Sequence, residues 1–333
     1  MENLTHSLTG YMMHHAGLKE LCPNALPVLL MAVNLPDIDI AAAFFGDLAV
    51  LEWRRGLTHS VILMFAWALA PLLPMLLLAR RRMRWKRAYA VSLLGVASHL
   101  LLDWTNSYGV RFLAPFSGRR FHLDLNSISD LWILAVLLLA AGWILLSKLV
   151  SSEIGAKAAG GRAAAITALL LCCFWVGGRY LLHERAVATL DSRIYQQRPP
   201  LRAAAFPRFA SPFHWTGVVE TGEAHHRFEM NLLDGEFDPE AGRTFYKPEA
   251  GGTPAAVRET RSFRSFLAFA RFPVWRIVPA DEPEGAARVE VTDLRFGVPH
   301  DSRFMAAALV DGQGRLIEEG FHIRWPGGKR PGE

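Results

Sequence analysis

The chain has 333 residues, of which 51% are hydrophobic and only 20% are charged, with a formal net charge of +5. A soluble protein of this size normally carries a larger charged fraction, so the composition argues against a soluble globular protein. Six basic residues crowd into a run of eight positions: Arg80, Arg81, Arg82, Arg84, Lys86 and Arg87. Because this run separates two apolar segments, it predicts a cytoplasmic loop beside a membrane, and we expect no nucleic-acid partner.

Four apolar segments are long enough to span a bilayer, at residues 61–79, 88–104, 131–146 and 163–182. A fifth segment, residues 25–46, is broken by "NLPDID" and is predicted to be a re-entrant or buried element. Whether it crosses the membrane is left open; if it crosses, His6 should lie on the other side from the remaining polar motifs. The positive-inside rule places residues 105–130 and everything after residue 182 outside the cytoplasm.

From residue 184 the sequence becomes polar and alternating, as in "HWTGVVE", "HRFEMNLL", "ARVEVTDLRFG" and "FMAAALVD". "HERAVATLDSRIYQQRPP" predicts a short helix that ends at the proline pair, and "VDGQGRLIEEGFHIRW" predicts a hairpin across residues 311–314. The expected fold is an α-helical integral membrane domain, residues 1–183, with about four spans and the re-entrant element. A small β-rich (α+β) extracytoplasmic domain, residues 184–333, follows it.

The apolar segment at residues 88–104 ends in "SHLLLDW", which places His99 and Asp103 four residues apart on one helix face. Asn106 continues that face if the helix persists. The predicted topology brings this end of the helix to the outer membrane surface, where "RRGLTHS" also places His59. Ionisable residues close to lipid are costly and usually functional, although a structural hydrogen-bonded pair would also explain them.

Two further motifs can join this cluster: "NLPDID" offers Asp37 and Asp39, and "NLTHSLTG" offers His6. Simpler explanations are that His6 is a helix cap or a core residue and that Asp37 is an N-cap. Histidines and carboxylates without thiolates suit a divalent metal, first of all Zn²⁺, with Mn²⁺ or Fe²⁺ as alternatives. Nearby cations that could hold a phosphate, or merely anchor the chain at the interface, are Arg54, Arg55, Arg119 and Arg120.

The motifs "THSLTG", "LPDID", "RRGLTHS" and "SHLLLDWTNSYG" resemble, in this order, the YdjM-like family of membrane-bound, metal-dependent hydrolases. "RFLAPFSGRRF", "SISD" and "FLAFARFPVWRI" resemble the longer, YfhP-like members, which carry a β-rich C-terminal region. The motif style is also similar to that of zinc-dependent phospholipase C enzymes. The resemblance implies metal ligands at His6, Asp37, Asp39, His59, His99 and Asp103, with Asp130 as a further acidic position.

Two positions depart from the family pattern. Arg55 stands where many members have a histidine before "RG", and Ile40 stands where some have a histidine after "PDID". The first departure removes one candidate ligand or base.

The hypothesis is therefore a multi-pass hydrolase of the inner (plasma) membrane. Metal-activated water would attack a phosphoester or ester of a membrane lipid or lipid-linked substrate at the outer face. Asp39 would act as general base, with Arg55 and Asn106 as further catalytic residues. The alternative is a non-catalytic regulatory or scaffold protein with a structural metal site and a partner-binding β domain. A transporter fits less well because the ionisable residues gather at one face. The oligomeric state is not indicated.

Overall fold

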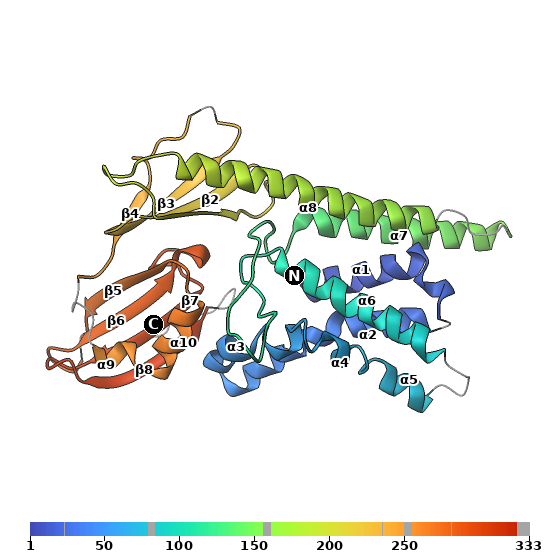
Figure 1. Cartoon of the computed structure of the whole chain (residues 1–333), viewed down its shortest axis with the longest axis horizontal. Helices are drawn as coiled ribbons and strands as arrows, with labels where there is room; N and C mark the ends of the chain where they lie inside the picture. Colours follow the sequence, from blue (N-terminus) through green and yellow to red (C-terminus); the bar gives the residue numbers. More distant parts are fainter. Residues whose placement is uncertain are drawn as a thin grey trace. The chain divides into compact units, whose positions relative to one another are not determined.

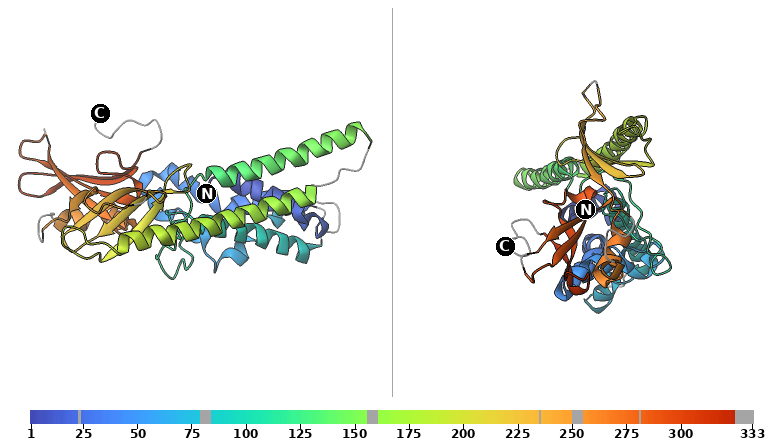
Figure 2. Two further views of the ribbon diagram at one scale, coloured as in Figure 1. Left: turned by 90° about the horizontal axis from the view of Figure 1, so that it is seen from above. Right: turned by 90° about the vertical axis from the view of Figure 1, so that its left-hand side faces the viewer.

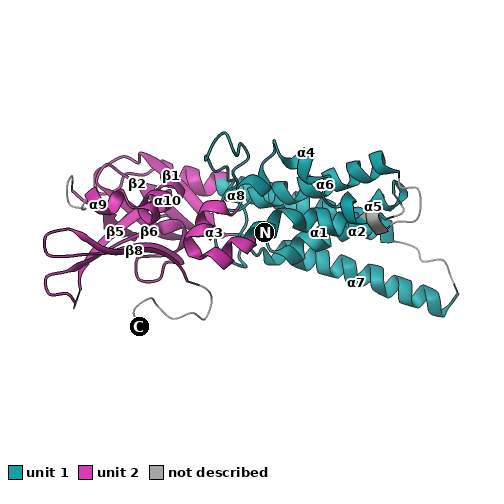
Figure 3. Ribbon diagram, turned by 90° about the horizontal axis from the view of Figure 1, so that it is seen from below, with its two compact units in different colours: residues 1–39, 55–183, 207–212 teal, residues 40–54, 184–206, 213–333 magenta. Residues whose placement is uncertain are grey.

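The computed structural model describes residues 1–22, 24–78, 84–155, 161–234, 236–249, 255–280 and 282–324. The chain divides into two compact units (Figure 3). The first unit comprises residues 1–39, 55–183 and 207–212, and the second comprises residues 40–54, 184–206 and 213–333. Residues 80–83, half of the predicted cytoplasmic loop at 80–87, lie outside the described residues.

The first unit is helical (Figure 1). Its α-helices are α1 (Asn3–Ala16), α2 (Ala25–Asn34), α4 (Met64–Trp67), α5 (Leu72–Leu78), α6 (Trp85–Trp104), α7 (Leu131–Glu153) and most of α8 (Gly161–Asp191). The described part of this unit also contains the 3₁₀ helices η1 (Leu18–Glu20), η2 (Leu35–Phe45, which passes into the second unit) and η3 (Leu57–His59). The helices α7 and α8, seen at full length in Figure 2, pack through Ile133, Leu137 and Ala165 against Met12 of α1.

Among the described residues, three helical segments are long and apolar enough to cross a membrane: Ala25–Phe45, α7 and α8. A fourth is added if the bent pair Asp47–His59 and Met64–Pro74 is taken as one span. The prediction of about four spans is therefore confirmed in number, but two assignments change. Ala25–Phe45, predicted as re-entrant, qualifies as a span, whereas α6 does not, because Lys86, Arg87 and Asp103 lower its hydropathy.

The predicted span at residues 61–79 is not one helix but the short helices α4 and α5 with turns before and between them. Pro71 and Pro74 lack the N–H that an α-helix interior requires. Ser60 holds the first turn, because its Oγ accepts hydrogen bonds from the backbone N–H groups of Ile62 (3.2 Å) and Leu63 (3.3 Å). The break leaves the residues just after His59 in a fixed, non-helical turn.

Close packing of α2 against α6 positions the polar motifs of both helices. Gly95 makes this approach possible, because a Cβ at that position would lie 2.8 Å from the Cβ of Ala32. Pro36 removes one N–H from the helical ladder, and the chain continues after Asn34 as the tighter 3₁₀ helix η2. The consequence is that the "LPDID" motif begins where α2 packs on the His99 end of α6.

The second unit contains two four-stranded sheets with orders β1-β2-β3-β4 and β5-β6-β7-β8, with antiparallel pairing throughout the second sheet. The strands are β1 (Arg202–Pro207), β2 (His214–Glu220), β3 (Ala224–Asn231), β4 (Arg243–Tyr246), β5 (Pro273–Pro279), β6 (Ala287–Asp293), β7 (Phe304–Val310) and β8 (Leu316–Ile323). Helices α9 (Ala255–Arg258) and α10 (Arg261–Phe269) and the 3₁₀ turn η4 (Leu294–Phe296) complete it. The predicted β-rich character and the hairpin across residues 311–314 are confirmed.

Two features of the second unit differ from expectation. The segment after residue 183 is not a separate short helix, because α8 continues unbroken to Asp191, and Gly217 leaves room for its Leu190. The second unit also includes residues 40–54 from the N-terminal half, with helix α3 (Asp47–Trp53). The carboxylate of Glu52 accepts two hydrogen bonds from the Arg261 guanidinium, at 3.0 and 2.6 Å, which fastens α3 to α10.

Candidate metal centre

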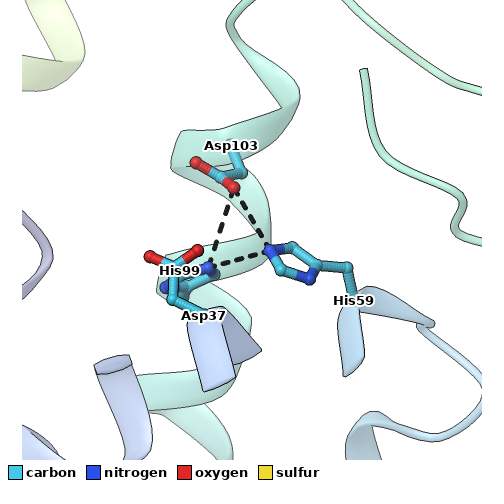
Figure 4. A group of neighbouring side chains, drawn as sticks. All are labelled: Asp37, His59, His99 and Asp103. Atoms are coloured by element: carbon cyan, nitrogen blue, oxygen red, sulfur yellow. Dashed lines mark hydrogen bonds and ion pairs between the residues drawn. The ribbon is translucent and has the colours of Figure 1, made fainter. Parts of the chain in front are cut away.

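Four buried side chains of the first unit form a cluster that could hold a metal ion: Asp37, His59, His99 and Asp103 (Figure 4). Each offers one ligand atom, and these atoms all lie within 4.8 Å of one another. The side chains are at most 3% exposed. Figure 4 shows that His99 and Asp103 project from one helix, α6, whereas Asp37 and His59 come from separate segments.

The orientation of His99 is fixed by a backbone acceptor. Its Nδ1 lies 2.7 Å from the carbonyl oxygen of Val33, near the end of α2. A carbonyl can only accept, so Nδ1 carries the proton and Nε2 presents a lone pair to the cluster. This arrangement is the usual one for a metal-binding histidine, whose second nitrogen is held by an outer partner.

His59 is oriented in the same way by Thr58 and Asp39. The Nδ1 of His59 lies 2.9 Å from Thr58 Oγ1 and 3.3 Å from Asp39 Oδ2. The Thr58 hydroxyl donates to Asp39 Oδ2 at 2.9 Å, so its oxygen remains an acceptor for the His59 ring. The proton of His59 therefore also resides on Nδ1, and Nε2 presents its lone pair to the cluster.

As a result, two unprotonated ring nitrogens face each other, with His59 Nε2 and His99 Nε2 only 3.1 Å apart. The Asp103 carboxylate lies against both, with its Oδ2 at 3.2 Å from His59 Nε2 and 3.7 Å from His99 Nε2. Acceptors that face acceptors in a buried site are unfavourable unless a cation lies between them. Imidazole nitrogens with carboxylate oxygens form a donor set that fits Zn²⁺, Mn²⁺ or Fe²⁺.

Asp37 and Asp39 occupy different places, although both were predicted to be ligands. In the 3₁₀ helix η2, with three residues per turn, residues two apart point to different sides. Asp37 joins the four-residue cluster. Asp39 lies behind His59 and accepts hydrogen bonds from Thr58 Oγ1 and from the backbone N–H of Arg55, the latter at 2.7 Å.

His6 lies beside the cluster but is not one of its four residues. Its fully buried ring stacks on His99 with a centroid separation of 3.8 Å, and its Nε2 lies 3.5 Å from Asp103 Oδ1. The expectation that His6 leaves the site if residues 25–46 form a span does not hold. The helix α1 folds back along α2, and Ser7 Oγ accepts a hydrogen bond from Asn34 Nδ2 at 2.9 Å, so His6 remains near "LPDID".

Arg55 and Asn106 form a buried polar layer next to Asp103. Arg55 Nε lies 2.8 Å from Asp103 Oδ2, and Arg55 Nη1 donates to Asn106 Oδ1 at 2.6 Å. Asn106 Oδ1 also accepts from the backbone N–H of Tyr108 at 3.0 Å. The amino group of Met1 contacts Asp103 Oδ1. Cationic groups thus already contact both oxygens of Asp103, and Arg55 shares Oδ2 with the two histidines.

The other predicted acidic and basic positions have separate roles. Asp130 is the N-cap of α7, where its Oδ1 accepts from the N–H groups of Trp132 and Ile133, both at 3.1 Å. Arg54 ends α3 in the second unit. The guanidinium groups of Arg119 and Arg120 lie over aromatic rings, 5.1 Å from the centroids of Phe121 and Tyr108 respectively.

Sequence reasoning missed two groups that orient the histidines, namely the Thr58 hydroxyl and the Val33 carbonyl. Thr58 directly precedes His59, and this proximity was the available signal, although a Thr-His pair also suits a helix start. The backbone carbonyl of Val33 leaves no signal in the sequence.

The fold and the cluster define a membrane protein whose helical unit contains a buried group of side chains that could hold a metal ion. Residues 1–186 match the model of the YdjM inner membrane protein family. This match covers more than half of the chain, which is therefore a member of that family. No curated protein and no solved structure matches the chain. The resemblance to zinc-dependent phospholipase C gains no support from these comparisons.

Proposed function

We propose that the protein is a membrane-bound, metal-dependent hydrolase whose divalent cation is held by His59, His99, Asp103 and Asp37. The observation that carries the proposal is the 3.1 Å separation of two histidine Nε2 atoms whose Nδ1 atoms are both committed to acceptors. His59 and His99 would each give one ring nitrogen to a bound cation, which would relieve the repulsion between these two acceptors. Zn²⁺ suits this donor set best, with Mn²⁺ or Fe²⁺ as alternatives.

A divalent cation bound there would lower the pKa of a water molecule and so supply a nucleophile near neutral pH. The residues of the chain perform the remaining work. Thr58 and Asp39 keep His59 in one tautomer and orientation. Asp37 has two carboxylate oxygens, of which one would suffice for ligation, and the other would be free to act as general base toward a water molecule. The general-base role thus moves from Asp39, which orients His59, to Asp37.

Arg55 favours a phosphoester over a carboxylic ester as the substrate. Its guanidinium is ion-paired with Asp103 at 2.8 Å and held in place by Asn106. Arg55 would be able to donate to a phosphoryl oxygen if Asp103 served as a metal ligand. The planar guanidinium matches phosphate geometry and keeps its charge at every physiological pH. In this proposal Arg55, which stands where many family members have a histidine, binds the anionic substrate and not the metal.

One observation favours a second candidate, a structural metal site in a non-catalytic membrane protein. Four protein ligands that are at most 3% exposed are typical of closed structural sites, whereas catalytic sites keep one position for water or substrate. In this alternative the cation would fasten η2, η3 and α6 together, and the second unit would bind a partner.

Hydrolysis assays separate the two candidates. The detergent-purified full-length protein, loaded with Zn²⁺, Mn²⁺ or Fe²⁺, is assayed against phosphomonoesters, phosphodiesters and carboxylic esters with short and long acyl chains. We expect metal-dependent phosphoester cleavage, and we expect Arg55→Gln to retain its metal while kcat falls by roughly 100-fold or more. A metal-loaded protein that cleaves none of these substrates would establish the structural role.

We also propose that residues 184–333 lie outside the cytoplasm of an inner-membrane protein, because the basic residues at positions 80–87 are cytoplasmic by the positive-inside rule and α6, α7 and α8 all cross after them. In this topology α6 crosses as a polar helix, with His99 and Asp103 buried within the protein. Reporter fusions after residue 324 test this orientation. A periplasm-specific reporter should be active there and a cytoplasm-specific reporter inactive; the opposite pattern would reverse the topology.

A further inference from the structure

The loop between α6 and α7 contains a compact segment, residues 110–121, that the metal centre does not use. The two ends of this 110–121 loop are joined by reciprocal hydrogen bonds between Val110 and Phe121, both 2.8 Å long. Inside it, Ala114 N–H donates to the Arg111 carbonyl and Ser117 N–H donates to the Leu113 carbonyl, both at 3.1 Å. The loop therefore has a defined shape of its own.

The 110–121 loop is attached to the residues on both sides of His59. Ser60 Oγ donates to the Ala114 carbonyl at 2.6 Å, and Val61 N–H donates to the Phe112 carbonyl at 3.0 Å. On the other side, the carbonyl of Arg55 accepts from Arg111 N–H at 3.0 Å. The loop and the candidate metal centre thus belong to one hydrogen-bonded structure.

The tip of the loop is apolar and exposed. Phe116 is 81% exposed and Leu113 is 43% exposed, and Pro115 between them is also exposed. Exposed aromatic side chains on an ordered loop are unfavourable in water and are typical of contact surfaces. In a membrane protein, such side chains are enriched where the chain meets the lipid headgroups.

Arginines connect this tip to the metal centre. Arg119 lies over the Phe121 ring, and Arg120 lies over the Tyr108 ring. The guanidinium of Arg55, which contacts Asp103, also lies 5.1 Å from the centroid of Tyr108. Arginines therefore occur both at the base of the apolar tip and at the metal centre. The Tyr108 ring contacts Arg120 at the tip and Arg55 at the metal centre. This charge pattern complements an anionic phosphate headgroup at a membrane surface.

We propose that the 110–121 loop is a lipid-binding element: Leu113 and Phe116 enter the membrane interface, and Arg119 and Arg120 bind the phosphate of an anionic phospholipid. The substrate of the metal centre is then the phosphoester of a membrane lipid that the loop receives from the bilayer. The substrate clause rests on the proposed function, whereas the lipid contact of the loop does not.

The insertion of the tip is tested with a fluorescent probe in the full-length protein. Cys22, Cys172 and Cys173 are replaced by alanine, and Phe116→Cys is labelled with an environment-sensitive fluorophore in lipid nanodiscs. The matched control is Leu233→Cys, an apolar residue that is 67% exposed between β3 and β4 of the second unit. We expect nitroxide-labelled lipids to quench the probe at position 116 and iodide to quench the probe at position 233. A probe at position 116 that iodide quenches as fully as the control would overturn the insertion.

Headgroup binding is tested with metal-free protein in nanodiscs of phosphatidylcholine alone or in an equal mixture with phosphatidylglycerol. We expect a fluorescent phosphatidylglycerol to bind preferentially, and each of Arg119→Gln and Arg120→Gln to weaken this binding about fivefold, with recovery in the lysine variants. Glycerol phosphate and inorganic phosphate serve as competitors: weak competition supports recognition of a membrane-borne headgroup. Strong competition by free phosphate, or unchanged binding by both glutamine variants, contradicts it.

These readouts need neither metal nor turnover, so they separate the two proposals. Lipid binding without hydrolysis would refute the enzyme and retain the loop's role. Hydrolysis of soluble phosphoesters with no lipid contact at position 116 would support the enzyme and refute the lipid-binding role of the loop.

Discussion

The two units each bury a cluster of charged side chains, but only one cluster is complete by itself. In the second unit, Asp293 is fully buried and accepts hydrogen bonds from the backbone N–H of Arg271 (2.8 Å) and Arg295 (3.0 Å) and from Arg295 Nε (2.8 Å). The Arg295 side chain also donates to the Phe269 carbonyl at 2.7 Å. Every contact there pairs a donor with an acceptor.

The cluster of the first unit does not pair in this way. Asp103 is paired with Arg55 and the Met1 amino group, but His59 Nε2 and His99 Nε2 are both acceptors and face each other at 3.1 Å. The pairing of donors with acceptors thus distinguishes a structural cluster of buried charged side chains from one that could bind a ligand. A cluster whose donors and acceptors match stabilises the fold, whereas two buried acceptor atoms that face each other mark a position that could hold a cation.

The largest loss of stability should come from removing Asp293, the carboxylate of the fully paired cluster in the second unit. In Asp293→Ala, the guanidinium of Arg295 stays buried without its carboxylate, and the free energy of unfolding of the second unit should fall by roughly 3–5 kcal/mol. Metal content should remain that of the parent. Denaturant unfolding and elemental analysis measure the two quantities. A loss of stability below about 1 kcal/mol would mean that this pair contributes little.

Gly95→Ala should affect the packing that builds the incomplete cluster. The new Cβ would lie 2.8 Å from the Cβ of Ala32, and α2 must move away from α6. We expect a loss of about 1–3 kcal/mol in unfolding free energy. We also expect weaker metal binding, because the Val33 carbonyl moves away from His99 Nδ1. Gly142→Ala in α7, where a Cβ meets nothing within 4 Å, is the matched control. Equal effects of the two variants would count against the packing argument.

Thr58→Val removes the hydroxyl between His59 and Asp39 but keeps the shape of the side chain. His59 then loses one partner that fixes its tautomer, and metal affinity should fall by about 10- to 100-fold, as is usual when a group that orients a metal-binding histidine is removed. Thr58→Ser should restore most of that affinity. Competition with a fluorescent chelator measures both. An unchanged affinity in Thr58→Val would show that Asp39 alone orients His59.

The smallest effect is a pH dependence in the second unit. Burial lowers the pKa of His225 to about 4, although Glu220 opposes the shift. In the unfolded chain the histidine has a pKa near 6.5, so below that pH the unfolded state binds a proton that the folded state does not bind. The free energy of unfolding is therefore highest above about pH 6.5 and declines as the pH falls toward 4. Between pH 7 and pH 5 we expect a loss of about 1–2 kcal/mol, measured by denaturant unfolding.

His225→Asn should flatten this part of the stability profile. The same slope in the parent and the variant would assign the pH dependence to other groups.

The spacing of residues in the sequence predicted much of the candidate metal centre. His99 and Asp103 lie four residues apart on a continuous helix, and the structure buries both on the same face of α6. His59 was expected near them from the order of spans, and it does lie there, although through the turn η3 rather than a helix start. The long helices α7 and α8 and the hairpin of β7 and β8 followed from hydropathy and turn residues, because these are local signals.

The remaining features depend on contacts that no local pattern reports. Asp37 and Asp39 have the same surroundings in the sequence, and only the tight winding after Pro36 decides which one faces His99. Arg55 turns toward Asp103 because two residues about fifty positions later hold it: Asn106 accepts from its guanidinium, and the Arg111 N–H donates to its backbone carbonyl. The grouping of residues 40–54 with the second unit rests on pairs such as Asp47 with the N–H of Ile323, more than 270 residues apart.

The most direct test of the central claim is elemental analysis of the purified full-length protein beside His99→Ala/Asp103→Ala, with circular dichroism to establish equal folding. His14→Ala/His15→Ala, which removes two histidines outside the cluster, serves as the matched control. We predict about one equivalent of Zn, Mn or Fe in the parent and in the control variant, and none in His99→Ala/Asp103→Ala. Equal metal content in all three proteins, or none in the parent after reconstitution, would contradict the account, and the facing rings would then be bridged by a proton alone.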